Sequence, residues 1–251
     1  MSLTACAALV ERADPDRFRA VMAAPVPARR VLFPLFAFNV EVSRAPWVTQ
    51  EPMIAEMRLQ WWRDALDEIG SDATPRKHEI VDALADVLDP AGAASLDALV
   101  AARRWDVYKD AFEDAAHLDE YINATSGGLL WTAARLLGPA EEQPVRDFAT
   151  GVGIANLLRA VPELESRSRI PLIDGTPQGV RDLAQKGLDH LNRAAAARAT
   201  ISPAAAPALL SGWAARPVLQ QAIASPQRVV DGALSPGNLR FTYVALRGWM
   251  R

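Results

Sequence analysis

Acidic residues spaced four apart recur along the chain, and three such pairs are candidates for binding a divalent cation. Carboxylates at that spacing lie on one face of a helix, where their oxygens can share a Mg²⁺ ion. Apolar residues beside the second pair, Ile80, Leu84 and Val87, place those two acids on the opposite, outward face. We therefore expect solvent-exposed acids rather than metal ligands in all three pairs: Asp64/Glu68, Asp82/Asp86 and Asp110/Asp114.

The histidines and glycines match no common catalytic motif. His78, His117 and His190 are not spaced for a shared metal site, and no serine or cysteine nucleophile elbow accompanies them. His78 and His117 stand near predicted helix starts, where we expect capping or surface roles. The sequence has no glycine-rich phosphate loop. Gly151 and Gly153 are instead expected to let another helix pack closely.

Arginines stand beside tryptophans in two segments, a combination that can build a diphosphate or headgroup pocket. More commonly, the arginine stem packs on the indole ring at the surface as a cation–π contact. We favour the surface contact and keep the pocket as an alternative for both segments, which hold Arg58, Arg63, Trp61 and Trp62, and Arg103, Arg104 and Trp105.

The composition is typical of a globular protein of one domain. The chain has 251 residues, of which 50% are apolar and 23% are charged, and its formal net charge is −3. That charge does not favour nucleic-acid binding, which needs a concentrated basic patch. The lone cysteine, Cys6, excludes an internal disulfide framework. We expect one domain over residues 1–251.

The sequence also limits the localisation. No signal-peptide pattern opens the chain, and no uninterrupted apolar run reaches the roughly 18 residues that a membrane span needs. We expect a cytoplasmic protein, with contact to the inner membrane at most peripheral.

Helical signals recur along the whole chain. Proline at helix starts and glycine after helix ends punctuate it, as at Asp14-Pro15 and Gly70. Apolar residues follow a helical period. One predicted apolar stripe consists of the four-residue series Met57, Trp61, Ala65 and Ile69, widened by Ile54, Trp62 and Leu66. The predicted fold is all-α, with helices over 28–45, 52–69, 76–88, 95–109, 117–137, 142–161, 177–199, 203–224 and 236–250. The helix over 28–45 is expected to be buried.

Two of these segments carry a family resemblance. Residues 35–44, LFAFNVEVSR, and residues 153–160, GIANLLRA, resemble the two aspartate-bearing helices of the squalene/phytoene synthases. Where that family has aspartates, this chain has Ser43 and Arg44 in the first helix and Ala160 and Leu164 in the second. Residues 57–66, 78–84, 121–130 and 168–172 extend the resemblance over about residues 12–175.

The resemblance implies an isoprenoid-synthase-like helical bundle around a central apolar cavity. In the family, carboxylates hold Mg²⁺ against prenyl diphosphates, which are joined head to head. This chain resembles more closely a divergent branch that lacks the aspartates and includes a factor needed to assemble respiratory complex I. We expect no catalytic residues, no metal site and no cofactor. The candidates for lining the cavity or binding an anion are Asn39, Ser43, Arg44, Tyr121, Asn156 and Arg159.

Two functional hypotheses follow. The first is a catalytically degenerate protein that binds a respiratory-complex assembly partner or an isoprenoid-like lipid. The second is an active head-to-head prenyl transferase whose Mg²⁺ ligands are Glu41, Glu163 and Glu165. Against the second, Glu163 is offset by about 100° from Leu164 on a helix, and Pro162 is expected to end regular helix just before it. We favour the first hypothesis.

Overall fold

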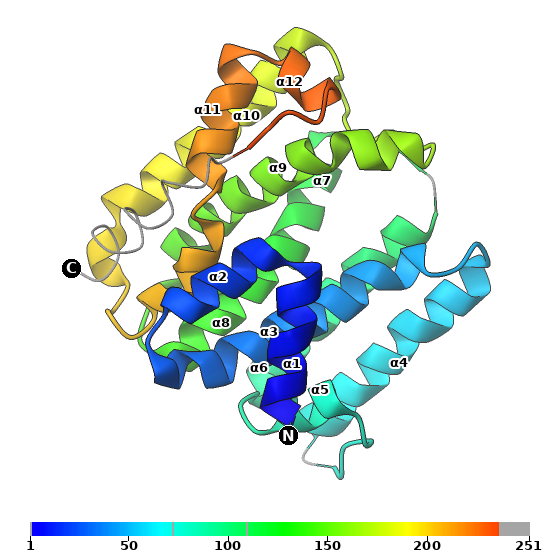
Figure 1. Cartoon of the computed structure of the whole chain (residues 1–251), viewed down its shortest axis with the longest axis vertical. Coiled ribbons are helices and arrows are strands. Elements are labelled where there is room, and N and C mark those ends of the chain that lie inside the picture. The colour runs from blue at the N-terminus through cyan, green and yellow to red at the C-terminus, as the bar shows by residue number, and fades with distance from the viewer. Residues whose placement is uncertain (1, 72, 109, 236–251) are drawn as a thin grey trace.

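The computed structural model describes residues 2–71, 73–108 and 110–235 (Figure 1). Helices account for nearly all of the regular structure within these ranges, and the prediction of an all-α fold is confirmed. The α-helices are α1 (Ser2–Ala13), α2 (Pro15–Ala23), α3 (Val26–Arg44), α4 (Pro52–Gly70), α5 (Glu79–Ala85), α6 (Pro90–Arg103), α7 (Ala115–Ile122), α8 (Gly128–Leu137), α9 (Glu142–Ser166), α10 (Pro177–Ala196), α11 (Ala215–Ala224) and α12 (Gln227–Val230).

Shorter helical turns connect several of these elements. The 3₁₀ turns are η1 (Ala45–Trp47), η2 (Arg104–Val107), η4 (Arg198–Thr200) and η5 (Ala206–Gly212), and one π-helical turn, η3 (Asn123–Gly127), joins α7 to α8. The predicted helix over 236–250 lies outside the described residues.

Side-chain caps explain why several helices begin where they do. An oxygen of the residue before the helix accepts a hydrogen bond from a main-chain N–H in the first turn, which satisfies one of the otherwise unpaired donors there. Asp14, Asp89, Asp114 and Thr176 each cap in this way, for α2, α6, α7 and α10. These local signals can be read from the sequence without tertiary information.

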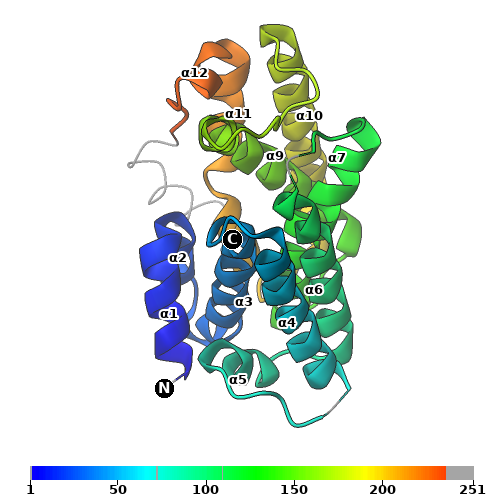
Figure 2. The same ribbon diagram turned by 90° about the vertical axis from the view of Figure 1, so that its right-hand side faces the viewer.

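Helix α3 is the buried centre of the fold, as predicted. Leu35, Phe36 and Phe38 have no exposed surface, and Leu32 is 1% exposed. Figure 2 shows α1 and α2 on one side of α3, with α4 and α6 on the other. Burying each such side chain contributes about 1.5–3 kcal/mol, so this helix fixes the positions of the others around it.

The glycines of α9 permit close helix packing, which confirms that prediction. A Cβ atom on Gly151 would lie 2.6 Å from Leu191 Cγ of α10, and one on Gly153 would lie 2.6 Å from Ile122 Cγ2 at the end of α7. Both distances are well inside van der Waals contact. Glycine at these positions therefore sets how closely α9 approaches its neighbours on two different faces.

Several predicted boundaries were wrong. The expected helix over 95–109 begins earlier, at Pro90, because Asp89 caps it, and its last part is the 3₁₀ turn η2. The expected helix over 76–88 is reduced to Glu79–Ala85. The expected helix over 203–224 divides into η5 and α11. Most importantly, α9 continues through Pro162 to Ser166, so this proline does not end the helix.

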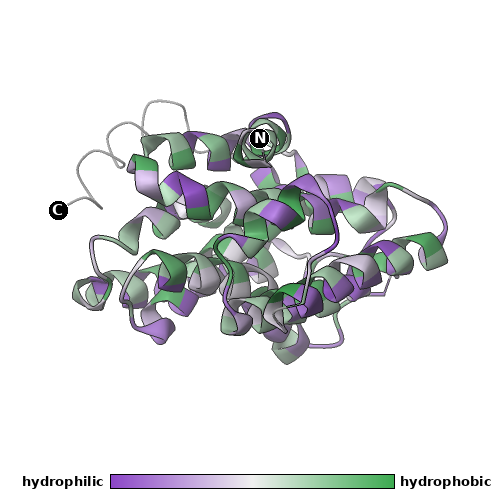
Figure 3. Cartoon of the chain, turned by 90° about the horizontal axis from the view of Figure 1, so that it is seen from below, coloured by the Kyte–Doolittle hydropathy of each residue, from purple (hydrophilic) through white to green (hydrophobic). Residues whose placement is uncertain are grey.

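The stripe predicted for α4 was also partly wrong. Met57 is 66% exposed, whereas Leu59 has no exposed surface. Trp62, Ala65 and Leu66 of the predicted stripe are buried, but the core face also carries Ala55 and Leu59, which the stripe did not include. Figure 3 shows apolar and polar residues interleaved along the helices. Within the described ranges, no helix has the length and apolar character needed to cross a bilayer.

Candidate functional site

A cavity of about 790 Å³ lies among the helices that carry the predicted site residues. Its walls come from the C-terminal ends of α1, α3 and α6, the N-terminal ends of α2 and α8, the turns η1 and η2, α7 with η3, and the C-terminal half of α9. The volume lies within the range of ligand pockets, about 300–1,000 Å³. Segments that are far apart in the sequence therefore enclose one potential binding site.

The structure brings together most of the residues singled out from the sequence. Asn39, Ser43 and Arg44 of α3, Tyr121 of α7 and Asn156 of α9 line the cavity. Arg159 is not among the lining residues: its Nη2 donates a hydrogen bond to Asp16 Oδ2 of α2 at 3.2 Å. Whether the five lining residues bind an anion stays a prediction.

The positions that carry aspartates in the resembling family also face the cavity. Ser43, Arg44, Ala160 and Leu164 all line it. The Ser43 hydroxyl donates to the main-chain carbonyl of Val40 at 3.1 Å, so its polar group is engaged within its own helix. All four motif positions face the cavity, but none of them supplies a carboxylate.

These residues do not fit a Mg²⁺ cluster. Among the described lining residues, the carboxylates are Asp106 and Glu163, and each is paired with an arginine. The described residues contain no group of three or more histidines, cysteines and acids that could hold a metal ion. Since Mg²⁺ selects carboxylate and other oxygen ligands in octahedral geometry, the donor set here does not match that ion.

The acids considered as substitute ligands do not converge. Glu41 lies 3.9 Å from Arg44 in an ion pair and is not among the lining residues, and neither is the exposed Glu165. Glu163 does line the cavity beside Leu164, although its offset on the helix had argued against this. Its carboxylate is held 2.6 Å from Arg167. Of these three acids, Glu163 alone lines the cavity, and its carboxylate is already paired with Arg167.

A buried cluster of ionic and phenolic groups forms one wall. The Tyr121 hydroxyl donates to Asp106, with 2.9 Å to each carboxylate oxygen, and Arg103 Nη1 lies 2.9 Å from Asp106 Oδ2. Burial raises the pKa of Tyr121, so the phenol stays protonated and remains a donor. Burial opposes the charge of Arg103, but Tyr121 and Asp106 outweigh it and its pKa is raised.

Arg169 belongs to the same wall and was not identified as a site residue from the sequence. It is 6% exposed, and its Nη1 donates to the main-chain carbonyls of Asp106 and Tyr108, while Nη2 donates to that of Trp105. The guanidinium carbon lies 4.9 Å from the Trp105 ring centre and 5.6 Å from that of Trp47.

A tight turn places Arg169 in this position. Ser168 has a φ of 61°, in the left-handed region that costs a non-glycine residue energy. The turn follows the end of α9 and returns the chain toward η2. The partners of Arg169 lie more than sixty residues earlier in the chain, so no local sequence signal could have identified them.

The predicted arginine–tryptophan contacts form with different partners. Arg76, not Arg58 or Arg63, lies over Trp61 at 5.1 Å. Arg63 pairs with Asp97 at 2.7 Å, and Arg104 pairs with Glu56 at 2.6 Å. Arg103 contacts the Tyr121 ring. The expectation that sequence neighbours would pair was therefore wrong, because neighbouring residues on a helix point in different directions.

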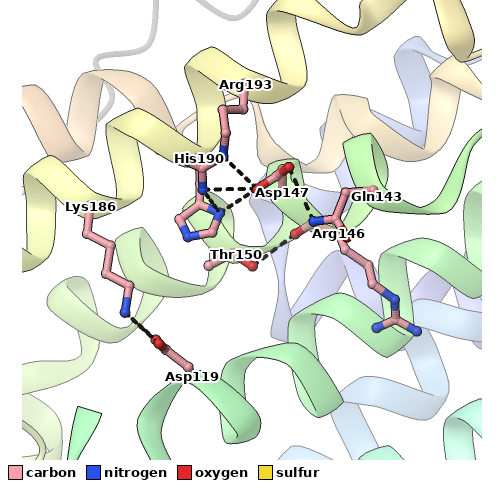
Figure 4. A network of polar contacts seen from close by, with 8 residues as sticks. All are labelled: Asp119, Gln143, Arg146, Asp147, Thr150, Lys186, His190 and Arg193. Atoms are coloured by element: carbon pink, nitrogen blue, oxygen red, sulfur yellow. Dashed lines mark hydrogen bonds and ion pairs between the residues drawn. The ribbon is translucent and has the colours of Figure 1, made fainter. Parts of the chain in front are cut away.

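The remaining predictions about histidines and acids are confirmed where the structure tests them. His78 caps α5 by accepting a hydrogen bond from the N–H of Ile80. Asp82, Asp86 and Asp110 are exposed, and Asp114 is an exposed helix cap. Asp64 and Glu68 are partly exposed and pair with Arg76. His190 instead lies 2.6 Å from the buried Asp147, in a network between α9 and α10 (Figure 4).

Comparison with known proteins extends these observations. The family model for squalene/phytoene synthase matches residues 10–172. A "NADH dehydrogenase (ubiquinone) complex I, assembly factor 6 homolog" of Drosophila melanogaster is 33% identical over 178 residues, which cover 67% of this chain and 53% of the relative. The assembly factor 6 of Bos taurus is 25% identical over 169 residues, which cover 66% and 51%. The chain thus spans about half the length of these curated relatives.

Solved structures support the fold assignment. A dehydrosqualene synthase, solved with a ligand, matches with a TM-score of 0.79 and 14% identity over 98% of this chain and 94% of its own. The squalene synthase HpnC from Alicyclobacillus acidocaldarius matches with a TM-score of 0.72 and 14% identity over 88% and 92%. At this identity the likeness concerns the fold alone. Because the family model covers well over half of the sequence, the chain belongs to the squalene/phytoene synthase family.

Proposed function

We propose that this protein acts by binding rather than by prenyl transfer, as an assembly factor for a respiratory complex of the complex I type. The observation that carries the proposal is the state of the four motif positions. Ser43, Arg44, Ala160 and Leu164 face the cavity, yet none of them supplies a carboxylate to hold Mg²⁺.

Electrostatics explains why this loss argues against catalysis. When a prenyl diphosphate ionises, the leaving diphosphate carries several negative charges, and clustered divalent cations stabilise them in the transition state. Arg44 and its neighbours supply single, fixed charges that do not bridge several diphosphate oxygens as Mg²⁺ ions do. A site of this composition can hold an anion but gives weak support to its departure.

The names of the relatives support the assembly role. The fly and bovine proteins are described as complex I assembly factors, and they match over about two thirds of this chain. A protein of that role needs a partner-binding surface and no chemistry in its cavity. We therefore propose a complex I subunit or assembly intermediate as the partner, met on the cytoplasmic side of the inner membrane through contact that is at most peripheral.

An assay for diphosphate release tests the absence of catalysis. The purified protein is incubated with farnesyl or geranylgeranyl diphosphate and Mg²⁺, with an active dehydrosqualene synthase as positive control. We expect no enzymatic release of diphosphate. Turnover above about 0.1 s⁻¹, within one or two orders of magnitude of ordinary enzymes, would contradict the proposal.

A gene deletion tests the assembly role. We expect membranes of the deletion strain to contain less assembled complex I and to oxidise NADH more slowly, and we expect the wild-type gene to restore both. Other respiratory complexes, measured in the same membranes, serve as the control. Unchanged complex I content in the deletion strain would rule the assembly role out.

A further inference from the structure

The cavity wall carries more positive than negative charge. Among the described residues, five arginines and two carboxylates line it. Arg103 is paired with Asp106, Arg167 with Glu163, and Arg17 with Asp14. These three pairs use both cavity carboxylates. Of the other two arginines, Arg44 has a carboxylate oxygen only at 3.9 Å, and Arg169 is hydrogen-bonded to main-chain carbonyls within the described residues.

Arg169 is the more unusual of the two, because it is buried. Its hydrogen bonds within the described part of the chain go to main-chain carbonyls, which carry no formal charge. Carbonyl dipoles and two indole rings reduce the cost of burying the guanidinium but do not neutralise it. A guanidinium has five N–H donors, and three donor contacts leave further N–H groups for a ligand.

Arg44 is the second cavity arginine and lies near the same tryptophan in the sequence. It is three residues before Trp47, its side chain is 53% exposed, and the nearest carboxylate oxygen, from Glu41, is 3.9 Å away. That distance is at the limit of an ion pair and beyond a hydrogen bond. Arg44, Trp47 and Arg169 all line the cavity, with the Arg169 guanidinium 5.6 Å from the Trp47 ring centre.

A third observation points to an incomplete polar site. The Nε atom of Arg103 is buried and has no hydrogen-bond partner among the described residues. Leaving such a donor unpaired costs about 1–3 kcal/mol, and a bound acceptor would remove that cost. Arg103 lines the same cavity as Arg44 and Arg169.

Part of the wall is apolar. Ile122, Leu129 and Leu157 line the cavity together with Phe112, which stacks on Trp105 at 4.0 Å. Apolar side chains and arginines in one cavity match an amphiphile, whose hydrocarbon part leaves water while its charged head pairs with arginine. Arginine pairs well with phosphate because its planar fork donates two parallel hydrogen bonds.

We propose that the cavity binds a phosphorylated amphiphile without any divalent metal, with the phosphate on Arg44 and Arg169 and the hydrocarbon chain against Ile122, Leu129 and Leu157. This inference rests on the proposed non-catalytic function and names the ligand class of its cavity. The two arginine side chains take the role that a metal ion would have in neutralising the phosphate.

Binding in the presence of EDTA tests the inference directly. Farnesyl monophosphate and a lysophosphatidic acid are titrated into the full chain by calorimetry, with farnesol as the uncharged control. We expect at least one phosphorylated ligand to bind about tenfold or more tightly than farnesol, with the same affinity in EDTA and in Mg²⁺. The preferred ligand of the two identifies an isoprenoid or a glycerolipid source.

Two substitutions assign the phosphate contact. Arg44→Gln and Arg169→Gln are each expected to weaken binding about tenfold, whereas Arg58→Gln, a matched change at an exposed arginine of α4 outside the cavity, leaves it unchanged. Circular dichroism checks folding. If Arg169→Gln fails to fold, the partly exposed Arg44→Gln decides alone.

The outcomes also separate this inference from the proposed function. No binding of either ligand in EDTA, a tenfold loss of affinity when Mg²⁺ is removed, or wild-type affinity in folded arginine variants would each overturn the metal-free site. None of these results involves turnover. Diphosphate release with Mg²⁺ would instead overturn the non-catalytic function, and it is measured separately.

Discussion

Two polar clusters on opposite faces of α9 differ in how completely their charges are matched. On the face toward α10, Asp147 lies 2.6 Å from His190 and 3.1 Å from Arg193 (Figure 4). Nearby, Lys186 of α10 bonds both carboxylate oxygens of Asp119 at 2.6 Å. On the cavity side, Arg169 has carbonyls and indole rings as partners in place of an acid.

We interpret the fully paired cluster as a contact between helices and the incompletely paired one as a binding site. The α9–α10 network, which we define as Asp147, His190 and Arg193, joins its carboxylate to the Arg193 guanidinium and to the His190 ring, and holds two helices together. The cavity wall keeps cationic groups oriented toward an open volume at an energetic cost. A buried charge without an opposite charge lowers the stability of the folded protein. An arginine of this kind beside a cavity is therefore better explained by ligand binding than by a contribution to stability.

The largest expected effect is on stability at the cavity wall. Arg169→Ala removes the donors for the carbonyls of Trp105, Asp106 and Tyr108, and we expect the free energy of unfolding to fall by about 3 kcal/mol. Arg193→Ala, at a half-exposed arginine of the α9–α10 network, is the control and should cost less than about 1 kcal/mol. Urea unfolding measures both, and equal losses would refute the distinction.

The next effect separates the two faces of α9 by packing. Gly151→Ala places a Cβ 2.6 Å from Leu191 Cγ and should destabilise the fold by about 1–3 kcal/mol without altering ligand affinity. Gly153→Ala pushes on Ile122 at the cavity and should lower both stability and affinity. Gly175→Ala, where a Cβ meets nothing within 4 Å, is the matched control. Thermal unfolding and ligand titration distinguish the three.

A smaller loss is expected from the α9–α10 network itself. Asp147→Asn keeps the shape of the side chain but removes the charge that His190 and Arg193 share. We expect about 1–2 kcal/mol of destabilisation, since Asp147 is buried and its partners are partly exposed. Ligand binding in the cavity should not change. Weaker binding by this variant would show that the two clusters are coupled.

The smallest effect concerns acid stability at a third, fully paired site. Arg135 lies 2.5 Å from Asp89, and its hydrogen bonds lower the pKa of that carboxyl to about 2. A depressed folded-state pKa adds stability above the unfolded value, near pH 3.9, which is lost as pH falls toward 2.

Because Asp89 is 44% exposed, solvent screening limits this contribution to about 1 kcal/mol. Urea unfolding of the wild type and of Asp89→Asn should therefore converge between pH 5 and 2. A difference that stays constant over this range would show that the ion pair does not carry the effect.

Much of the fold could be predicted because its signals are local. The cap at Asp14-Pro15 and the apolar series of α3 act within one or two turns, and the structure agrees with both. Prediction was weaker where tertiary contacts override local preference. Pro162 is accommodated inside α9, and Met57 faces outward while Leu59 takes the core position.

The candidate site shows the same division. The sequence by itself determined the family and the absence of aspartates at positions 43, 44, 160 and 164, because residue identity needs no coordinates. Only the tertiary structure decided which cations face the cavity: Arg159 bonds Asp16 outside it, and Arg169 turns inward. A helix rotates each successive side chain by about 100°, and contacts across sixty residues depend on packing that no local pattern encodes.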